Sequence, residues 1–581
     1  MPERRVIPTE RSADLITTTL LVNGEELSSE YQILSITVEK EINRIPWAKI
    51  VLLDGDPAQQ DFNLSNQQSF VPGNTVEVKA GYHSQNETIF KGLILRHNLK
   101  IRTTGALLIV ECKDETVKMT VGRKSNCFYD SLDSDAIEEI AGSYGFPVEI
   151  ESSSVVQQQL VQFDVSDWDF CVTRAQANGK VCFADDGKFK FKTPDYEQNE
   201  QLSLVFGATI LDLDAEIDAT QQCQTVTSFG WDAANQEVLE ATADNTAITL
   251  NGNLSNEELS GVIELEKLEL KEGSIGNSEM AQTWANAKKM FNQLAKIRGR
   301  VKFQGVANVK PDTTIVLAGV GDRFNGKVYV SGVKHQIADG DWTCDAQFGI
   351  NPKWFSETVD INAAPAAGLM AAVNGLQVAK VTQLEEDPDG EYRVKVNIPL
   401  VNNIEEGIWA RIASLDAGAG RGSFFRPELE DEVIVGFIND NPATPVILGM
   451  LNSSAKPAPI EPSDENHEKG FVTRSGIKLM FNDENESVNV ETPSGKKITI
   501  DDNAGNICVE DEAGSKIVLN AEGISMETDA DFKISASGDI SFEANNIEIK
   551  ANGNFKAEGA AGSELSSSAI TEIKGSLVNI N

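Results

Sequence analysis

Short runs of alternating apolar and polar residues fill the first part of the chain. Two examples are YQILSITVEKEIN and NTVEVKAGYH, and turn residues separate each run from the next. Alternation with a period of two places the apolar side chains on one face of a strand. Many such strands in succession are typical of a barrel or a sandwich. We therefore predict a β-barrel domain over residues 1–130.

After these strands, the spacing of apolar residues changes to the spacing that is typical of helices. SLDSDAIEEIAGSYGF and VSDWDFCVTRAQANGK are both expected to be helical. In the second segment, Ser166 and Asp169 have the spacing of a capping box, and Gly179 stands where a helix would end. A third segment predicts a helix over residues 278–298 that ends at Gly299. Its apolar residues share one face, which we expect to pack against a sheet: Met280, Trp284, Ala287, Phe291 and Leu294.

Changes in composition divide the rest of the chain. Residues 131–361 mix these helices with further strands and form a second, α+β region. An Ala- and Gly-rich linker at 362–375 precedes a compact run of strands at 376–455, which predicts a small barrel of the oligonucleotide/oligosaccharide-binding (OB) type. No aromatic platform with interleaved Arg is visible in it, so we favour a structural role over nucleic-acid binding. A Pro-rich linker at 456–470 leads to the final segment, 471–581.

The final segment is a repeat. Apolar residues recur in pairs, with one residue between the two members, and Gly, Asn and Asp stand near the turns. Successive pairs are 11, 10, 9, 10, 7, 8, 8 and 7 residues apart. A period that settles near eight residues predicts a β-solenoid. The pairs are Ile477/Leu479, Val488/Val490, Ile498/Ile500, Ile507/Val509, Ile517/Leu519, Ile524/Met526, Phe532/Ile534, Ile540/Phe542 and Ile547/Ile549.

So short a repeat does not close a solenoid within one chain. About eight residues supply one strand and one corner, whereas a coil around a core needs three sides. Burial of the paired side chains is also too small to offset the conformational entropy lost when this segment becomes ordered. Strand pairing with neighbouring chains must supply the difference. We therefore predict an intertwined triple-stranded β-helix at 471–581, formed by a homotrimer, as a rod on the order of 50 Å long.

Charge and cysteine content narrow the class of protein. The chain has 89 acidic and 50 basic residues, for a formal net charge of -39. Binding to phosphate backbones needs clustered cations, so nucleic acid is not an expected partner. The 7 cysteines form no C-x-x-C pair, which favours free thiols and a reducing compartment. The N-terminus has an Arg4-Arg5 pair, but Thr17, Thr18 and Thr19 interrupt its apolar run, so we expect neither a signal peptide nor a membrane span.

Candidate chemistry is sparse. His83, His97, His335 and His467 are the only histidines, and they are dispersed. DDNAGN at 501–506 and EDE at 510–512 suggest calcium, but their order fits neither an EF-hand loop nor the glycine-rich nonapeptide, and we favour solvated corners. GVGDRFNG at 319–326 has no following helix and predicts a hairpin turn rather than a phosphate-binding loop. We assign no catalytic, cofactor-binding or metal-binding residue.

The order of these parts resembles the spike proteins of contractile injection machines. That family includes the VgrG tip proteins of type VI secretion, the spikes of extracellular contractile injection systems, and the fused hub and spike of contractile phage tails. SDWDFCVTRAQANG at 166–179 resembles the helix motif of the family's hub, and GEYRVKVNIP, IWARIAS and RPELEDEVIVGFINDNPATPVILGML resemble its barrel. In two barrel loops the chain departs from the pattern: Glu430 replaces a usual Gly, and Asp440-Asn441 replaces a usual Gly-Asp.

The resemblance implies a function. Two related hub domains per chain, in a trimer, would match a hexameric inner tube and contact baseplate components. The barrel would surround the start of a needle that sheath contraction drives through a target membrane. A PAAR-type tip protein would cap the needle, and the spike could carry effector cargo. Such a protein is not an enzyme, needs no cofactor, and is assembled in the bacterial cytoplasm as part of a contractile particle that could be released extracellularly or delivered into target cells.

Two other functions remain open at this point. A β-helical tailspike-type enzyme would degrade a polysaccharide with paired carboxylates. It would also need aromatic side chains to hold the sugar, and the predicted needle has no Trp or Tyr. A passive adhesin would instead bind a receptor through its C-terminal third.

Overall fold

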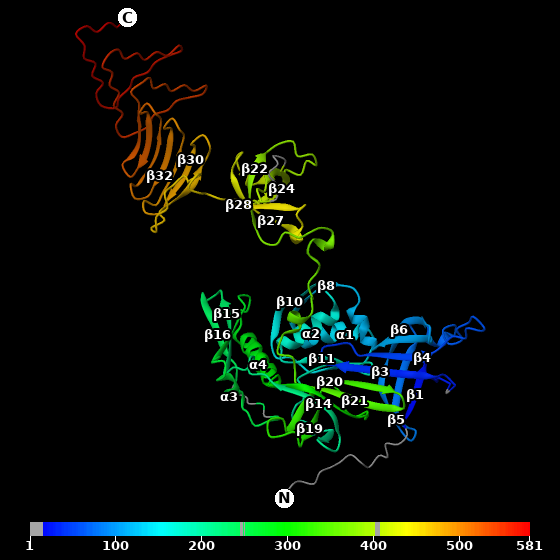
Figure 1. The fold of residues 1–581 in the computed structure, drawn as a ribbon. Coiled ribbons are helices and arrows are strands. Elements are labelled where there is room, and N and C mark those ends of the chain that lie inside the picture. The colour runs from blue at the N-terminus through cyan, green and yellow to red at the C-terminus, as the bar shows by residue number, and fades with distance from the viewer. Residues whose placement is uncertain (1–15, 29, 245–247, 249, 401–406, 581) are drawn as a thin grey trace. The chain divides into compact units, whose positions relative to one another are not determined.

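The protein is mostly β, and its residues fall into two compact units. The computed structural model describes residues 16–28, 30–244, 248, 250–400 and 407–580 (Figure 1). The first unit is Met1–Ala372 with Asn439–Pro442, and the second is Val373–Ile438 with Ala443–Asn581. The Arg4-Arg5 pair lies outside the described residues. Among the described residues, no helix combines the length and the apolar character needed to span a bilayer.

A thirteen-stranded sheet organises the first unit. Its main path runs β14-β18-β21-β20-β3-β4-β7-β6-β5-β1-β2, and β19 pairs with β20 and β13 beside it. The strands are β1 Ile16–Val22, β2 Glu25–Glu26, β3 Ile33–Glu41, β4 Trp47–Leu53, β5 Thr75–Tyr82, β6 Gln85–Arg102, β7 Gly105–Lys113, β13 Leu202–Val205, β14 Ile210–Ile217, β18 Ile297–Gln304, β19 Thr313–Ala318, β20 Gly326–Ala338 and β21 Asp341–Phe348.

This sheet joins the N-terminal strands to strands far along the sequence. β3 pairs antiparallel with β20, so that Ile36 lies opposite Ile337. One hydrophobic core serves both halves and includes Ile36, Val78, Phe303 and Trp342. The N-terminal strands therefore share a sheet and a core with residues 202–348. GVGDRFNG connects β19 to β20, which pair antiparallel, so the predicted hairpin turn is confirmed.

Smaller elements lie between these strands in the chain. β8 pairs with β10, β11 with β12 and β12 with β9, while β15 pairs with β16 and β17. Their bounds are β8 Lys124–Leu132, β9 Val148–Ile150, β10 Val156–Val165, β11 Val181–Asp185, β12 Lys188–Lys192, β15 Thr225–Asp232, β16 Glu237–Thr242 and β17 Lys267–Lys271. The helices are α1 Asp133–Gly142, α2 Asp167–Ala177, α3 Asn256–Ser260, α4 Ser278–Leu294 and α5 Phe355–Thr358. The 3-10 turns are η1 Gln68–Phe70, η2 Glu115–Thr120, η3 Pro365–Gly368 and η4 Ile438–Asp440.

The predicted ends of α2 are confirmed. The Ser166 hydroxyl accepts a hydrogen bond from the backbone N–H of Asp169, as an N-cap residue does. After the helix, Gly179 has a φ of 67°, in the left-handed region that favours glycine at a helix end. Local sequence therefore sets both limits of this helix.

The prediction for α4 is only partly correct. Its apolar face is buried, since Ala287, Phe291 and Leu294 belong to a core cluster. The helix ends at Leu294, however, and Gly299 is not its stop but a residue of strand β18. A Cβ at Gly299 would lie 2.2 Å from the backbone oxygen of Asp214 on β14, so glycine is required there by the close approach of a neighbouring strand.

Ion pairs connect the β11–β12 hairpin to Lys40 on β3 and to Lys310 in the loop before β19. Lys40 on β3 is 2% exposed and its Nζ lies 2.5 Å from Asp186 Oδ1. Lys310 Nζ lies 2.8 Å from Asp185 Oδ1. Burial by itself would raise the pKa of Asp185, but the hydrogen bond from Lys310 and the charges of Lys310, Lys40 and Lys190 outweigh it and lower the pKa to about 2.

This shift predicts a loss of stability in acid. A carboxyl whose pKa falls from 3.8 to about 2 on folding stabilises the protein above pH 3.8 and loses that contribution as the pH falls toward 2. The contribution amounts to about 2 kcal/mol. We expect Asp185→Asn to flatten the fall in unfolding free energy over this range, as measured by urea unfolding at several pH values. The exposed control Asp322→Asn should leave the fall unchanged, and equal curves for the two variants would refute the assignment.

The second unit begins with a closed barrel, as predicted from the sequence. Five strands close it in the order β22-β23-β24-β28-β27. They are β22 Gln377–Gln383, β23 Val394–Asn397, β24 Ile408–Ile412, β27 Glu432–Phe437 and β28 Pro445–Met450, and the short strands β25 Ala417–Gly418 and β26 Arg421–Gly422 form a hairpin beside them. Valines at alternate positions, such as Val394, Val396, Val433 and Val435, fill the barrel interior.

A seven-stranded antiparallel sheet follows, in which each strand pairs with the next. Its strands are β29 Glu468–Val472, β30 Lys478–Asn482, β31 Ser487–Glu491, β32 Lys497–Asp501, β33 Asn506–Glu510, β34 Lys516–Asn520 and β35 Gly523–Glu527. Within one chain, these repeats form successive hairpins rather than successive sides of a prism. Residues 528–580 form no strand within the chain. The intertwined three-chain β-helix stays a prediction.

Candidate functional site

One face of the C-terminal sheet carries two unbroken rows of apolar side chains. Strand register aligns them from one strand to the next, as with Ile498 opposite Val509 and Ile500 opposite Ile507. The first row is Phe471, Leu479, Val490, Ile498, Val509, Ile517 and Met526. The second row is Phe481, Val488, Ile500, Ile507, Leu519 and Ile524. We call this surface the apolar face.

The apolar face is open to solvent in the single chain. Ile498 and Ile500 are each 46% exposed, and Ile524 at the last strand is 68% exposed. A contiguous exposed apolar patch of this kind marks an interaction surface, because monomeric proteins rarely leave one uncovered. Sequence analysis found most of these residues but missed Phe471 and Phe481. It paired Leu479 with Ile477, whereas the structure places Ile477 before β30 and aligns Leu479 with Val490.

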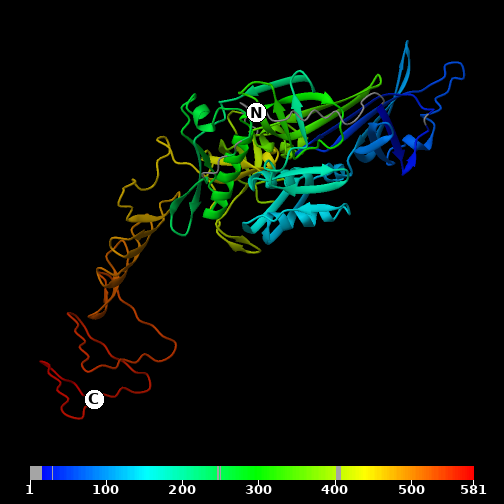
Figure 2. The ribbon, with the colours of Figure 1, turned by 90° about the horizontal axis from the view of Figure 1, so that it is seen from below.

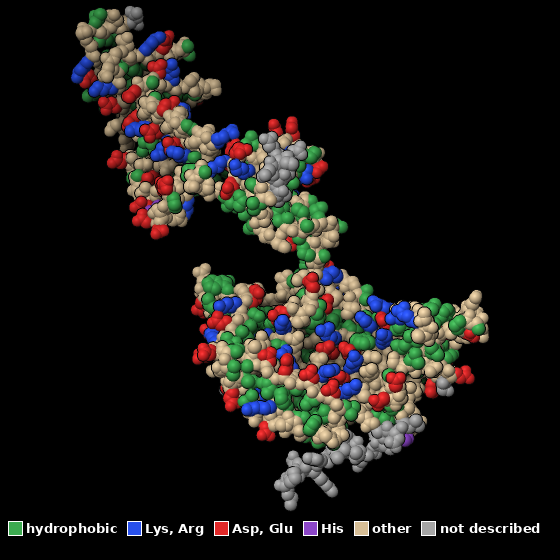
Figure 3. All heavy atoms as spheres, in the orientation of Figure 1, with side chains coloured by type: hydrophobic (Ala, Val, Ile, Leu, Met, Phe, Trp, Pro, Cys, Tyr) green, Lys and Arg blue, Asp and Glu red, His purple; other side chains and the backbone are tan. Residues whose placement is uncertain are grey.

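The opposite face carries a ladder of alternating charge. Along one margin, residues facing each other on successive strands are Lys478, Glu491, Lys497, Glu510, Lys516 and Glu527. At one end Lys478 Nζ lies 3.5 Å from Glu491 Oε2, and at the other Lys516 Nζ lies 3.1 Å from Glu527 Oε2. Opposite charges on facing strands stabilise a sheet and disfavour a shifted pairing. Figure 3 shows Lys, Arg, Asp and Glu side chains interspersed over this part of the chain.

Reversing one charge in this ladder should destabilise the sheet. Glu510→Lys would set three lysines side by side, because Glu510 faces Lys497 and Lys516. We expect a loss of about 1 kcal/mol per chain that 1 M salt largely restores, measured by thermal unfolding at low and high salt. The control Glu522→Lys, in the turn between β34 and β35, should cost little. If 1 M salt does not reduce the loss of stability, repulsion between charges in the ladder is not its cause.

Two contacts connect the barrel to the first strand and turn of the C-terminal sheet. The rings of Phe425 and Phe471 stack with centroids 5.1 Å apart. Arg474 Nη1 lies 2.8 Å from Glu428 Oε2. An aromatic stack beside an ion pair fixes the direction in which the chain leaves the barrel, so the barrel and the sheet meet through side chains as well as through the linker.

Both departures from the expected barrel pattern fall at strained positions. Glu430 has a φ of 67° and Asp440 a φ of 56°, in the left-handed region where glycine meets no steric penalty. We expect Glu430→Gly to raise the unfolding free energy of the barrel by about 0.5–1 kcal/mol. Thermal unfolding followed by Trp409 fluorescence would measure it. Glu391→Gly, at a residue without a positive φ, should give no gain, and a gain of equal size there would contradict the strain argument.

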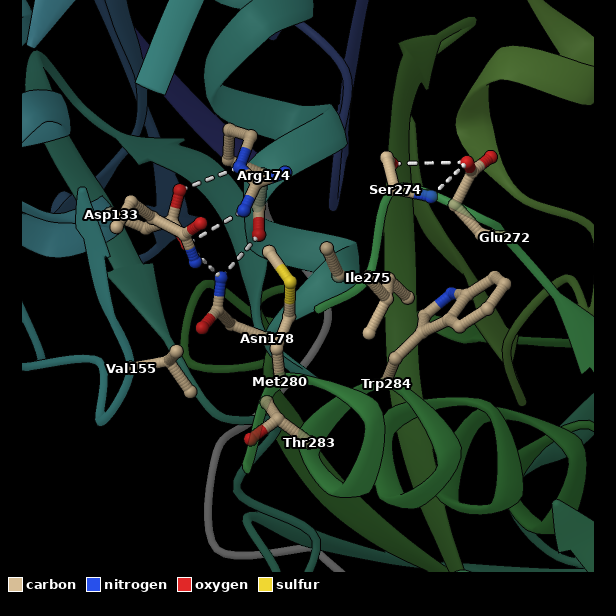
Figure 4. Close-up of a pocket in the computed structure, with 12 residues that line it drawn as sticks. Asp133, Val155, Arg174, Asn178, Glu272, Ser274, Ile275, Met280, Thr283 and Trp284 are labelled. Carbon is tan, nitrogen blue, oxygen red and sulfur yellow. Dashed lines mark hydrogen bonds and ion pairs between the residues drawn. The ribbon is translucent and has the colours of Figure 1, made fainter. Parts of the chain in front are cut away.

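A pocket of about 200 Å³ lies in the first unit between α1, α2 and α4 (Figure 4). The polar side is held by Asp133, whose two oxygens accept hydrogen bonds from Arg174 Nε at 2.5 Å and Nη2 at 2.9 Å. Ile275, Met280 and Trp284 form an apolar side. The pocket is smaller than the roughly 300–1,000 Å³ of small-molecule sites. Asp133 is already paired with Arg174, and Glu272 accepts hydrogen bonds from the backbone N–H and the hydroxyl of Ser274, so both carboxylates that line the pocket are engaged within the chain.

Among the described residues, only one histidine lies close to a cysteine, and both residues are buried. His335 Nδ1 and Cys344 Sγ are 3.0 Å apart, and the two residues are 2% and 0% exposed. Burial lowers the pKa of His335 to about 3 and raises the pKa of Cys344 to about 12. Both groups are therefore neutral near pH 7, whereas a nucleophilic pair needs a thiolate. A structural role fits this pair.

The other histidines lie apart. His97 contacts Ser65 and the Phe70 carbonyl, His467 lies near Glu465, and His83 lies in a turn. Over the described ranges, no three His, Cys, Asp or Glu side chains form a cluster that could hold a metal ion. All seven cysteines are free, and five of them are buried.

The acidic stretches that suggested calcium serve the turns of the C-terminal sheet. Asp501 Oδ1 accepts a hydrogen bond from the backbone N–H of Ala504 at 2.7 Å. Asp511 Oδ1 accepts bonds from the N–H groups of Ala513 and Ser515. Glu512 pairs with Lys496 at 2.7 Å. These carboxylates are therefore engaged within the chain, as side chains in tight turns commonly are.

Two protein families match the chain. The family described as the Alg8 N-terminal domain matches residues 12–339. The family described as the type VI secretion system/phage-baseplate injector OB domain matches residues 377–451, which hold the closed barrel. No curated protein matches the sequence.

Solved structures resemble parts of the fold at low identity. A tail protein from Neisseria meningitidis is 12% identical, with a TM-score of 0.44, covering 58% of this chain and 98% of the other. The c3393 protein of E. coli, a component of the type VI secretion system, is 15% identical with a TM-score of 0.37, covering 74% and 99%. A chain of the Francisella PdpA-VgrG complex is 10% identical with a TM-score of 0.37, covering 88% of each chain. Scores this low establish no function.

Proposed function

We propose, for a chain that belongs to the Alg8 N-terminal domain family, a role as the trimeric central spike of a contractile injection apparatus. The match of its barrel to the injector OB domain family supports this proposal. The observation that carries the proposal is the apolar face, whose first row crosses seven strands and whose second row crosses six. Three copies that turn these faces toward a common axis would bury both rows. Three identical sheets related by a threefold axis form a closed prism with no open face.

The segment beyond the sheet supports the same arrangement. Residues 528–580 keep the apolar alternation but form no strands in the single chain, and Ile540 and Ile547 are 49% and 56% exposed. Their backbone groups have no strand partner within the chain, and an extended segment of a neighbouring copy would supply one. The needle, which we assign to residues 471–581, would thus begin as three sheets and continue as an intertwined β-helix.

The other domains would connect this needle to the rest of the particle. We assign a hub to residues 1–361, as a barrel at 1–130 and an α+β region at 131–361, and the collar to the OB barrel at 376–455. Three hubs would meet a hexameric inner tube and the baseplate, and contraction would push the needle through a target membrane. A PAAR-type protein would cap the tip, and effector cargo would travel with it. Assembly would take place in the bacterial cytoplasm, and we propose no catalytic role.

The mass of the purified chain in solution tests the proposal. We expect light scattering to give three times the 63.1 kDa chain mass, and unboiled samples to migrate as trimers in SDS. The trimer should bind the tube protein of the same particle. It should leave capsular polysaccharide intact, in contrast to a tailspike enzyme. A monomer with a folded, protease-resistant C-terminal segment would refute the spike.

A further inference from the structure

One hairpin extends past the rest of the hub sheet. β5 pairs with β6 only as far as Leu93, whereas β6 continues to Arg102 against β7. β4 pairs with β7 only from Leu107 onward. Residues 96–106 therefore form the end of a hairpin whose β6 edge has no strand partner among the described residues and which extends past β4 at residues 101–106. We call it the β6–β7 arm; Figure 2 shows a hairpin in the blue of this part of the chain projecting beyond the sheet.

The arm is amphipathic. Leu99 and Ile101 lie on the face whose β7 partner Leu108 enters the hub core, and they are 39% and 64% exposed. Arg96, Lys100 and Arg102 alternate with them and lie on the other face. The apolar side of the core thus continues along the arm, where Leu99 is partly exposed and Ile101 mostly exposed.

The arm is also positively charged in an acidic protein. Residues 88–110 contain no Asp or Glu, although the chain carries a net charge of -39. Arg96 Nη1 lies 3.3 Å from Glu111 Oε2, but Lys100 and Arg102 are exposed and have no ion pair within the described chain. The positively charged side chains of Lys100 and Arg102 are therefore available to bind a partner outside the chain.

Basic residues on an edge strand have a simpler explanation, because they prevent unwanted strand pairing. That role does not account for the exposed Leu99 and Ile101, which would promote association. The base of the arm is also held in place. Ser65 Oγ lies 2.6 Å from His97 Nε2, and the Phe70 carbonyl lies 3.0 Å from His97 Nδ1. A fixed apolar and cationic projection fits a docking element.

The number of arms in the proposed trimer indicates which partner they bind. In the other half of the hub sheet, the β20–β21 hairpin is paired along its length, since Ala338 at its tip faces Ser35 on β3. Of these two hairpins of the hub sheet, only the β6–β7 hairpin forms such an arm, and a trimer would have three copies of it. Three arms match three neighbouring copies more simply than six tube subunits.

We propose that the β6–β7 arm docks on the hub of the neighbouring copy in the trimer. Leu99 and Ile101 would pack on apolar residues of that copy, while Lys100 and Arg102 would lie against its carboxylates. Chains of net charge -39 repel one another, so cations placed at their contact offset the repulsion and favour the correct neighbour. This inference rests on the proposed trimer.

A photocrosslinker tests the contact in the full-length protein. p-Benzoylphenylalanine at position 101 would be activated in an equal mixture of ¹⁴N- and ¹⁵N-labelled chains assembled together, followed by boiling and peptide mass spectrometry. We expect mixed-isotope crosslinks from position 101 to hub residues 16–360. The same group at Val238, a residue 60% exposed on β16, is the matched control and should give about tenfold fewer. Lys100→Glu with Arg102→Glu should reduce the crosslinks about tenfold, whereas Lys334→Glu with Lys353→Glu should not.

The outcomes separate this inference from the proposed function. A trimer by light scattering without crosslinks between chains from position 101 refutes the arm contact and leaves the spike intact. A monomer refutes both. Crosslinks that join position 101 only to a tube protein, or binding of the trimer to phosphatidylglycerol vesicles that Lys100→Glu with Arg102→Glu abolishes, would assign the arm to another partner and overturn the inference.

Discussion

Ile507→Asp is expected to convert the proposed trimer into monomers. Ile507 lies in the second row of the apolar face, between Ile500 and Leu519 on the neighbouring strands. In the proposed prism, three copies of the new carboxylate would be buried close to the threefold axis. Each unpaired buried charge costs several kcal/mol, and three like charges also repel one another. Light scattering should show a fall to the 63.1 kDa mass of one chain.

The adjacent residue provides the control. Cys508 lies between Thr499 and Val518 on the opposite face of the sheet. Cys508→Asp adds the same charge in the same strand but leaves both apolar rows intact, so the trimer should persist. Dissociation by both variants would mean that the charge disrupts the sheet itself. If neither variant dissociates, the apolar face does not form the axis of the trimer.

Asp133→Ala is expected to have the second-largest effect, on the hub. Asp133 is 1% exposed and holds the guanidinium of Arg174 through two hydrogen bonds. It also accepts a bond from Asn178 at the end of α2. Removing it would leave Arg174 without its partner and separate α1 from α2. Breaking a buried pair in this way costs about 3–5 kcal/mol.

Denaturant unfolding followed by tryptophan fluorescence would measure this loss. Six of the seven Trp residues lie in the first unit, so the signal reports mainly on the hub. Asp135→Ala removes an exposed carboxylate from the same turn of α1 and should cost far less. A similar loss for the two variants would show that the Asp133–Arg174 pair contributes little.

Sequence alone predicted the elements whose signals are local. The Ser166 cap and the Gly179 stop define α2 within a dozen residues, and short alternating strands with turn residues defined the OB barrel. Gly299 shows the limit of such signals. It resembled a helix stop, but its lack of a side chain is required by Asp214, about 85 residues earlier, which only the folded sheet brings near.

Pairing between strands that are distant in the chain could not be predicted from the sequence either, because no local signal reports it. Nothing local to Ile36 or Ile337 indicates that β3 and β20 are neighbours, and so the hub sheet had to be found in the structure. In the C-terminal segment, the period of two identified the apolar side of strands β30 to β35 correctly, whereas β29 with Phe471 was missed. It did not determine whether a turn folds back or continues around an axis, and the charge ladder became visible only once Glu510 was seen between Lys497 and Lys516.

The direction of the hydrogen bonds in the C-terminal sheet has a mechanical consequence. Strands β29 to β35 follow one another as a meander, so the bonds between them run along the line that connects the first strand to the last. Compression along that line presses the strands together and is resisted by the hard contact of backbone atoms. Tension along it loads the same bonds in series, and the outermost strand would peel away first. In the proposed needle, a sheet of this kind would withstand compression along its length but would come apart, strand by strand, under tension.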